Sequence, residues 1–558
     1  MKTTVFGIAA LASLAALTAS GQKIAPGIVG GRLMGLSDFT VTDMMQFSQQ
    51  QYVFGTARTA AMGGAFASLG ADLSTMSINP AGLGMYRNSE FGFSPSILST
   101  RTNSSSESPY RQGANGRTRF SPNNAGIAVN VYQGSGDVTS VTFGFAYNRL
   151  ADFNTQSSIG LYGERSTIAD VFAMQMRGFA PDKLGSGDGP FQNGDIPTAN
   201  WGGVLAYQTE LIDYVGDHVY GEEETQALYA SGRVIDDNAY IDNYLKSIRK
   251  GRIGEYSVSA GLNIKNKLYL GLTVGIQDLY YNESLQYDES FYNVENGQAV
   301  PHYKDLNYLL YDQSVEMNGT GVNFKFGAIY RPITGLRIGL AVHTPTFSTV
   351  TRTYNASMNA NYEEVSGPSD IARYSNDLIF DYRFNTPTRL LAGVSYTFGT
   401  VGIIAADYER AWYNGMRLRN VEQGWHDIFK QDAKNLFRAT NNVRVGLELK
   451  PTQQLAIRAG YGYYDSGVNK DLTKDGFMFN GPVALDSYTV SGGIGYRFTP
   501  ATSLDLAYVY MNTKYSDYDL FYYEGPDNGD TQIVIGQPYA ITTKQNKHLV
   551  TLSLGIRF

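Results

Sequence analysis

The sequence contains no cysteine among its 558 residues, so it can form neither a disulfide framework nor a thiolate metal site. Charged residues make up only 17% of the chain, and no basic stripe accompanies its formal charge of -7, so nothing indicates nucleic-acid binding. Beyond the N-terminus, no apolar run approaches the roughly 20 residues of a membrane-spanning helix. The chain is instead rich in tyrosine (41), phenylalanine (28) and glycine (61).

The first residues have the pattern of a secretory signal peptide. A short positive start, Met1–Lys2, precedes an apolar run over Val5–Leu17 and a small-residue cleavage site at Ala19–Gly21. This pattern predicts that residues 1–21 are removed, so that the mature chain begins at Gln22. No cysteine follows the site, which excludes a lipoprotein anchor.

Apolar residues alternate with polar or small ones in many segments. At the C-terminus, one face holds Val550, Leu552, Leu554, Ile556 and Phe558. Strict alternation predicts a strand with one apolar face, and the last aromatic residue resembles the terminal signal of bacterial outer-membrane barrels. The same pattern recurs over 268–276, 322–330, 443–449, 455–463 and 488–498. It fits either a secreted sandwich or a barrel whose polar face lines the lumen.

The lengths of the connections favour the barrel. Six short connections are predicted at 133–137, 265–267, 331–335, 399–400, 450–453 and 499–502. Seven long ones are predicted at roughly 100–123, 150–253, 290–318, 352–376, 412–441, 466–486 and 516–546. Long and short alternate strictly, as in barrels with short periplasmic turns and longer extracellular loops. The sequence therefore predicts an all-β fold, a transmembrane antiparallel β-barrel of 14 strands with both ends in the periplasm, in which 374–398 is one strand.

Residues 22–88 precede this barrel, which is predicted over 89–558. A barrel of 14 strands is wide enough to need filling or to leave a channel. Thr42–Asp43 is predicted to cap a short helix, and small residues at 60–68 permit close packing against a wall of glycine and serine. We therefore predict an N-terminal plug, or hatch, in the lumen on the periplasmic side; the alternative is an ordered periplasmic tail.

A turn in this segment carries a resemblance to a known family. Asn79, Pro80, Ala81 and Gly82 form the turn, within the stretch AMGGAFASLGADLSTMSINPAGLGMYRNSEF that leads into the first strand. The stretch resembles the N-terminal hatch of the FadL/TodX-type outer-membrane transport family. Two further stretches, VHTPTF and NTPTRLLAGVSYTF, are similar to the branch found in Bacteroidota.

The resemblance implies a 14-stranded outer-membrane barrel that takes up hydrophobic compounds such as fatty acids. In such a protein the outer loops catch the ligand, the hatch moves, and the ligand leaves sideways into the bilayer. Lateral exit spares an apolar molecule from contact with water. The resemblance implies neither a catalytic group nor a cofactor, so no enzyme activity is expected. The 150–253 loop is larger than in the better-known members.

Two prolines mark a candidate lateral gap. Pro345 lies about ten residues from the turn at Gly335, and Pro387 lies about eleven residues from the turn at Gly399, on the neighbouring strand. Proline donates no ladder hydrogen bond and so weakens strand pairing. Ten residues already reach the outer membrane surface, so the alternative is that both prolines lie above the lipid.

Five polar residues are predicted to face the lumen: His343, Asp407, Glu409, Arg444 and Arg458. Paired carboxylates can serve acid–base chemistry, but lumen strands commonly carry carboxylates beside arginines. We therefore predict polar lumen contacts rather than an active site, and no metal site.

Two functions remain open from the sequence. The first is passive uptake of a hydrophobic small molecule or lipid, which an apolar pocket between hatch and wall would favour. The second is a non-transporting subunit or shuttle of a secretion or outer-membrane assembly complex, with protein partners. A filled lumen, with loops held by a partner chain, would favour the second function.

Overall fold

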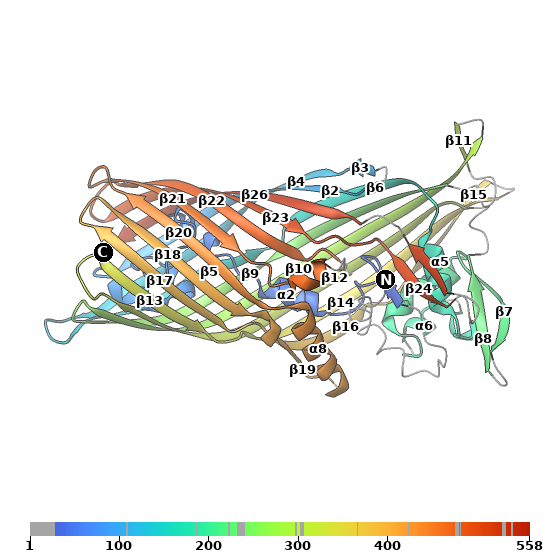
Figure 1. Cartoon of the computed structure of the whole chain (residues 1–558), viewed down its shortest axis with the longest axis horizontal. Helices are drawn as coiled ribbons and strands as arrows, with labels where there is room; N and C mark the ends of the chain where they lie inside the picture. Colours follow the sequence, from blue (N-terminus) through green and yellow to red (C-terminus); the bar gives the residue numbers. More distant parts are fainter. Residues whose placement is uncertain are drawn as a thin grey trace.

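The computed structural model describes residues 28–107, 110–185, 187–192, 194–220, 224–231, 240–295, 298–301, 306–364, 367–421, 423–474, 479, 481–526, 532–536 and 540–558. The predicted signal peptide and its cleavage site lie outside these residues. Figure 1 shows an elongated barrel with the C-terminus at one end and a group of helices and hairpins at the other. None of the described helices is long and apolar enough to cross a membrane.

A closed antiparallel barrel of 14 strands forms the wall, as predicted, and its first strand pairs with its last. In chain order the strands are β2 (Glu90–Ser105), β4 (Ala114–Gln133), β5 with β6 (Val138–Asp152, Thr155–Glu164), β9 (Tyr240–Ile264), β10 (Leu268–Glu295), β12 (Leu306–Tyr330), β13 with β14 (Leu336–His343, Phe347–Glu364), β16 with β17 (Leu378–Asn385, Arg389–Phe398), β18 with β19 (Gly402–Trp412, Arg417–Arg419), β20 (Ala439–Leu449), β21 (Leu455–Tyr464), β22 (Ala484–Arg497), β23 (Thr502–Tyr515) and β26 (Thr542–Arg557).

The two ends of the barrel differ. Short connections, such as 265–267 between β9 and β10, lie with the C-terminus at what we call the turn end (Figure 1). The opposite end, the loop end, carries the longer connections. Their elements are β3 (Tyr110–Gln112), α5 (Ile168–Met176), η4 (Pro181–Lys183), α6 (Gly189–Gln192), η5 (Thr198–Asn200), α7 (Trp201–Gln208), β7 (Asp213–Tyr220), β8 (Glu224–Ala230), β11 (Gln298–Pro301), β15 (Gly367–Tyr374), η6 (Tyr413–Gly415), α8 (Gln423–Leu436), α9 (Lys470–Lys474), β24 (Tyr522–Pro526) and β25 (Gln532–Gly536).

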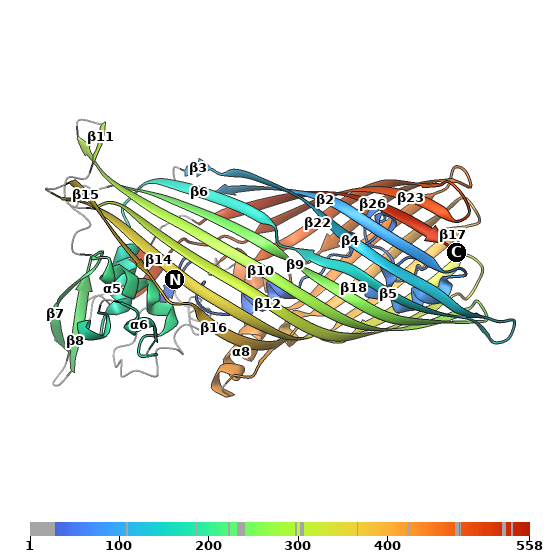
Figure 2. The same cartoon turned by 180° about the vertical axis from the view of Figure 1, so that it is seen from behind.

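Several strands extend far past the length that crosses a membrane, and Figure 2 shows β9, β10 and β12 running along most of the molecule. In β10 the apolar face changes sides. Near the turn end, Leu272 and Ile276 point outward and are 42% and 47% exposed, whereas beyond Gln277 the buried apolar residues, Tyr281 and Leu285, point inward. The switch comes after about ten residues, the length of a strand that crosses the hydrocarbon core. The rest of β10 therefore stands outside the membrane around an apolar interior.

The predicted loops at 100–123, 290–318 and 352–376 are wrong in large part. Most of these residues continue the strands of the wall, for example to Glu295 in β10 and from Leu306 in β12. The alternation continues there, but its apolar face points inward. Because the strands lack an outward apolar face in these stretches, the stretches were predicted as loops. The segment 374–398 occupies one position in the wall, but it is interrupted between β16 and β17.

The 150–253 connection supplies the apolar filling of the loop end. Helix α5 packs on α7, and Phe172 meets Tyr311 of the wall at 5.4 Å between ring centroids. Trp201 lies 6.2 Å from the ring of Tyr354 on β14. These residues belong to one large buried apolar cluster, shared by the insertion, the wall and the N-terminal segment. The loop end is therefore packed with protein.

The N-terminal segment fills the lumen and forms a plug. It begins at the loop end, where β1 (Ile28–Gly30) pairs with β24, so the expectation that the segment lies on the periplasmic side is wrong for its first described part. Its further elements are α2 (Val41–Ser48), η2 (Tyr52–Phe54), α3 (Ala57–Ala61), α4 (Thr75–Ile78) and η3 (Pro80–Met85). Helix α2 is capped by Thr40, in a capping box with Asp43, rather than by the expected Thr42.

Candidate functional site

The Asn79–Gly82 turn anchors the plug to the wall. Asn79 is fully buried, and its Oδ1 accepts from the Ala81 N–H at 3.1 Å. Its Nδ2 donates to the carbonyl of Ala67 within the plug at 2.6 Å, and also lies 3.3 Å and 3.4 Å from the carbonyls of Leu340 and Ala328 in the wall. Pro80 begins η3, with its fixed φ suited to the first helical position. One side chain thus shapes the turn and joins it to two wall strands.

Glycines in the wall allow the backbone of the plug to approach this closely. A Cβ at Gly271 would lie 2.1 Å from the Pro80 carbonyl carbon, and one at Gly327 would lie 1.9 Å from Asn79 Oδ1. Other wall glycines meet the plug at under 3.0 Å in the same way: Gly261, Gly339, Gly393, Gly446, Gly460 and Gly493. Any side chain at these positions would force the plug away from the wall.

Buried charges hold the plug on one side of the lumen. Glu409 accepts from Arg389 at 2.6 Å and from Arg444 at 2.8 Å, and all three side chains are at most 3% exposed. Arg389 also donates to the Ser48 carbonyl at the end of α2. The Arg444 guanidinium lies 4.7 Å from the ring of Tyr52 in the plug. Removing one partner of such a buried pair costs about 3–5 kcal/mol, so these contacts fix the plug strongly.

The remaining predicted lumen residues also reach the plug. Asp407 Oδ2 accepts from the Ala67 N–H at 2.7 Å, and His343 Nε2 lies 2.8 Å from the Ile78 carbonyl oxygen. Arg458 acts through Glu448, which accepts from it at 2.7 Å and from Arg58 of the plug at 3.0 Å. All five residues therefore lie in the lumen.

A second polar contact between the plug and the wall, on β9 and β12, was not predicted from the sequence. Glu255 accepts from Ser77 of the plug at 2.8 Å and forms an ion pair with Lys325, and both charged side chains are almost fully buried. The signal was one charged residue on the small-residue face of β9 and another on that of β12, with β10 between the two strands.

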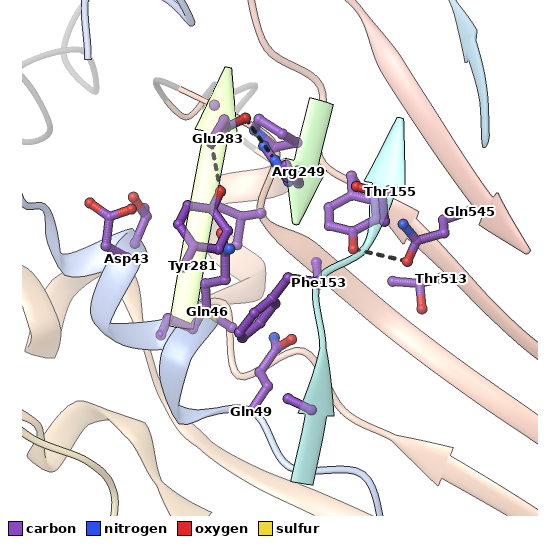
Figure 3. A pocket seen from close by; sticks show the side chains of 18 of the residues that line it. Asp43, Gln46, Gln49, Phe153, Thr155, Arg249, Tyr281, Glu283, Thr513 and Gln545 are labelled. Atoms are coloured by element: carbon purple, nitrogen blue, oxygen red, sulfur yellow. Dashed lines mark hydrogen bonds and ion pairs between the residues drawn. The ribbon is translucent and has the colours of Figure 1, made fainter. Parts of the chain in front are cut away.

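A cavity of about 130 Å³ lies between the plug and the wall, on the loop-end side of the buried charges. Helix α2 and the residues after it form one side, with Gln46 and Gln49 among them, and wall residues such as Phe153, Arg249 and Tyr281 form the other (Figure 3). The cavity reaches Tyr413. Its lining mixes polar and aromatic groups and is not purely apolar.

The wall is interrupted beside this cavity. Residues 344–346, with Pro345, separate β13 from β14, and residues 386–388, with Pro387, separate β16 from β17. The next strand breaks between Trp412 and Arg417. The registers of β13 with β17 and of β14 with β16 place the breaks at 344–346 and 386–388 opposite one another. Three neighbouring strands thus lose regular pairing at the same level; we call this the wall break.

Side chains replace part of the ladder at the wall break. The Thr346 N–H donates to Thr386 Oγ1 at 2.8 Å, and the Thr386 N–H donates to the Thr346 carbonyl at 3.1 Å. On the outer surface, Val342 below the break is 39% exposed and Phe347 above it is 47% exposed. Above Phe347 the outward residues are threonines. The break therefore lies at the loop-end border of the apolar band.

A closed barrel with an apolar outer band and a lumen filled by its own N-terminal segment is an occluded membrane channel. The model of the outer membrane protein transport protein family (OMPP1/FadL/TodX) matches residues 259–558, more than half of the chain. The chain belongs to this family of outer-membrane transport proteins. The turn end is therefore periplasmic, and the loop end is extracellular.

Several solved structures are similar to the chain. They include a Pseudomonas aeruginosa FadL homologue (13% identity, 90% of this chain and 98% of that chain covered, TM-score 0.49) and the CymD monoaromatic hydrocarbon channel (12%, 91%, 98%, 0.47). A third is the P. putida toluene transporter TodX (12%, 91%, 99%, 0.46). No curated protein matches the sequence. The assignment to the family rests on the family model.

Proposed function

We propose that the protein admits hydrophobic small molecules passively through the outer membrane, with lateral exit at the wall break. A molecule would enter between the extracellular elements, rest in the cavity beside α2 and leave near Pro345 and Pro387 into the outer leaflet. Lateral exit avoids the polar, tightly plugged periplasmic half of the lumen, where the free energy of an apolar solute would be higher than in lipid. The broken pairing of three neighbouring strands at one level supports this route.

The end of α2 is the gate in this proposal. The Ser48 carbonyl is held behind the break by Arg389, and its hydroxyl lies 3.5 Å from the Met416 sulfur. Cavity-lining residues Gln49 and Tyr413 lie next to this contact. A small displacement of residues 48–51 would therefore join the cavity to the break, while the anchored turn at Asn79 stays in place.

A reversible cross-link tests the route. The chain has no cysteine, so the variant Thr346→Cys/Thr386→Cys carries a single designed pair across the break, at two residues that are hydrogen-bonded to each other there. We expect oxidation to lower uptake of radiolabelled toluene by cells at least fivefold, and reductant to restore it. Val342→Cys/Leu390→Cys, a paired position below the break, should leave uptake unchanged. Full uptake with the break cross-linked would refute the route.

The second candidate function is a non-transporting barrel in a secretion or assembly complex. The filled lumen and the large apolar core at the loop end favour it, since both describe a stable platform. Purification from native membranes in mild detergent separates the two. Stoichiometric protein partners with no hydrophobic uptake would establish the second function in place of the first.

Three further assignments belong to the proposal. Residues 1–21 are a signal peptide removed before Gln22, residues 22–88 are the hatch, and residues 89–558 form the barrel. We also assign no catalytic role to the buried carboxylates of the described residues named above, because each pairs with an arginine, a lysine or the plug backbone. N-terminal sequencing of the mature protein checks the cleavage site.

A further inference from the structure

The chemistry of the cavity indicates what kind of molecule it accepts. Figure 3 shows Phe153 between Gln46 and Gln49 on one side and Thr513 with Gln545 on the other. The volume, about 130 Å³, is close to that of an engineered cavity of about 150 Å³ that holds benzene. The cavity therefore accommodates a single ring and is too small to enclose a whole long acyl chain.

The charges around the cavity nearly cancel. Four basic side chains line it, those of Arg32, Arg249, Arg352 and Lys547, against five acidic ones, those of Asp38, Asp43, Asp152, Glu283 and Asp465. Most already have partners: Glu283 pairs with Arg32 and, at 2.8 Å, with Arg249, and Lys547 donates to the Asp152 carbonyl at 2.8 Å. With five acidic against four basic side chains, the lining carries no excess of positive charge to compensate the burial of an anionic ligand, so a carboxylate is disfavoured.

Neutral polar groups remain available. Among the described residues, the side chains of Gln46, Gln49, Thr155 and Thr513 have no hydrogen-bond partner, although all four line the cavity. Thr155 and Thr513 are at most 9% exposed. Gln46 and Gln49 are half-buried. A ligand that excludes water from the cavity would leave these amides and hydroxyls unpaired, at a cost in free energy, unless it carries a matching polar group.

Two aromatic residues of the lining, Phe153 and Tyr281, pack on one another and on Phe47 of α2, which lies outside the lining. The rings of Phe153 and Tyr281 meet edge to face at 5.6 Å between centroids, and Phe47 of α2 lies 5.7 Å from Phe153 and 5.2 Å from Tyr281. Aromatic pairs at this spacing favour edge or offset contact with a further ring. The cavity thus offers a ring contact and, beside it, unpaired amides and hydroxyls.

We propose that the cavity is a binding site for an uncharged, ring-sized molecule that carries a hydroxyl or amide group, the chemistry of a phenol rather than of a hydrocarbon or a carboxylate. This inference rests on the proposed function, because the cavity lies on the proposed route. A site built to hydrogen-bond a ligand hydroxyl rejects the analogue that lacks it, since its own polar groups are then left unpaired.

Three matched molecules test this specificity. 4-Methylphenol, toluene and 4-methylbenzoate share a methylbenzene ring. The position opposite the methyl group carries a hydroxyl, a hydrogen and a carboxylate, respectively. Dissociation constants are measured by calorimetry on the full protein in nanodiscs, with empty nanodiscs as reference. We expect 4-methylphenol to bind at least tenfold more tightly than either of the other two.

Variants locate the preference. Gln46→Leu/Gln49→Leu should reduce the tenfold preference for 4-methylphenol to less than threefold. Thr513→Val, a smaller change, should reduce the preference at least twofold. Gln431→Leu on the exposed face of α8 should leave it unchanged. Equal or tighter binding of toluene or 4-methylbenzoate would overturn the inference, and so would a preference that survives both cavity variants.

Uptake assays separate this inference from the proposed function. If toluene uptake depends on the open wall break but the cavity prefers none of the three molecules, the inference fails and the proposed route stands. If none of the three binds or enters through the protein, both fail.

Discussion

Asn79→Ala tests how the plug is held. The substitution removes the acceptor for the Ala81 N–H and the donor to the Ala67 carbonyl, at 3.1 Å and 2.6 Å, together with two longer contacts to the wall. A buried hydrogen bond contributes about 1 kcal/mol net, and a long one about half of that. Only the two longer contacts, to Leu340 and Ala328, join the plug to the wall, so we expect the plug to lose about 1 kcal/mol of docking free energy, which raises its undocked population about fivefold.

Conductance in planar bilayers measures this loss. Asn79→Ala should show frequent ion-conducting openings at a voltage where the unchanged protein is closed, because an undocked plug leaves a water-filled lumen. Asn318→Ala, an exposed asparagine on the outer face of β12, is the matched control and should remain closed. A closed Asn79→Ala channel with unchanged stability would refute the anchoring role of the turn.

Three more predictions concern the packing, charge and pH response of the lumen and loop end. Gly327→Ala, whose Cβ would lie 1.9 Å from Asn79 Oδ1, should open the channel as strongly as Asn79→Ala, whereas Gly116→Ala, with open space around it, should not. Glu409→Gln should lower the unfolding free energy by at least about 3 kcal/mol in urea titrations, because two buried arginines lose their counter-charge; an unchanged midpoint would contradict this. Burial raises the pKa of Asp519 to about 6, so the stability it contributes is fully present below about pH 4 and is lost as the pH rises through 6. The protection factors of the β24 amides, which correct for base-catalysed intrinsic exchange, should accordingly fall between pH 5 and pH 7.5, and Asp519→Asn should abolish that fall.

The membrane-facing half of the barrel was predictable because its constraint is local. Lipid requires an apolar side chain at every second residue, and Val550, Leu552 and Leu554 meet this requirement within five residues of sequence. Turn lengths are equally local. The 14-strand count followed from these two signals.

The extracellular half was not recognised because its constraint is set by distant parts of the chain. Beyond Gln277, β10 faces the 150–253 insertion and the plug with its apolar side, so the alternation inverts. The inversion is visible at Leu279, Tyr281 and Leu285 once the strand is known to continue. Without knowledge of the packing partner, the composition of this stretch predicts an aromatic-rich loop.

The lumen contacts were partly predictable. Alternation placed Glu409 and Arg444 on the inner face. It did not show which charges pair, since Arg389 joins them from another strand. The cavity could not be predicted at all. It depends on how α2 lies against walls more than 100 residues away in sequence, and no short motif encodes that position.

In the proposed route, a small hydrophobic molecule passes from the cavity to the wall break and not along the plugged lumen. Anomalous diffraction from crystals soaked in bromobenzene tests it most directly, because bromine marks each occupied position. We predict bromine peaks in the cavity beside Phe153 and at the break between Thr346 and Thr386. Peaks on the periplasmic side of the plug around Asn79, with none at the break, would contradict the account.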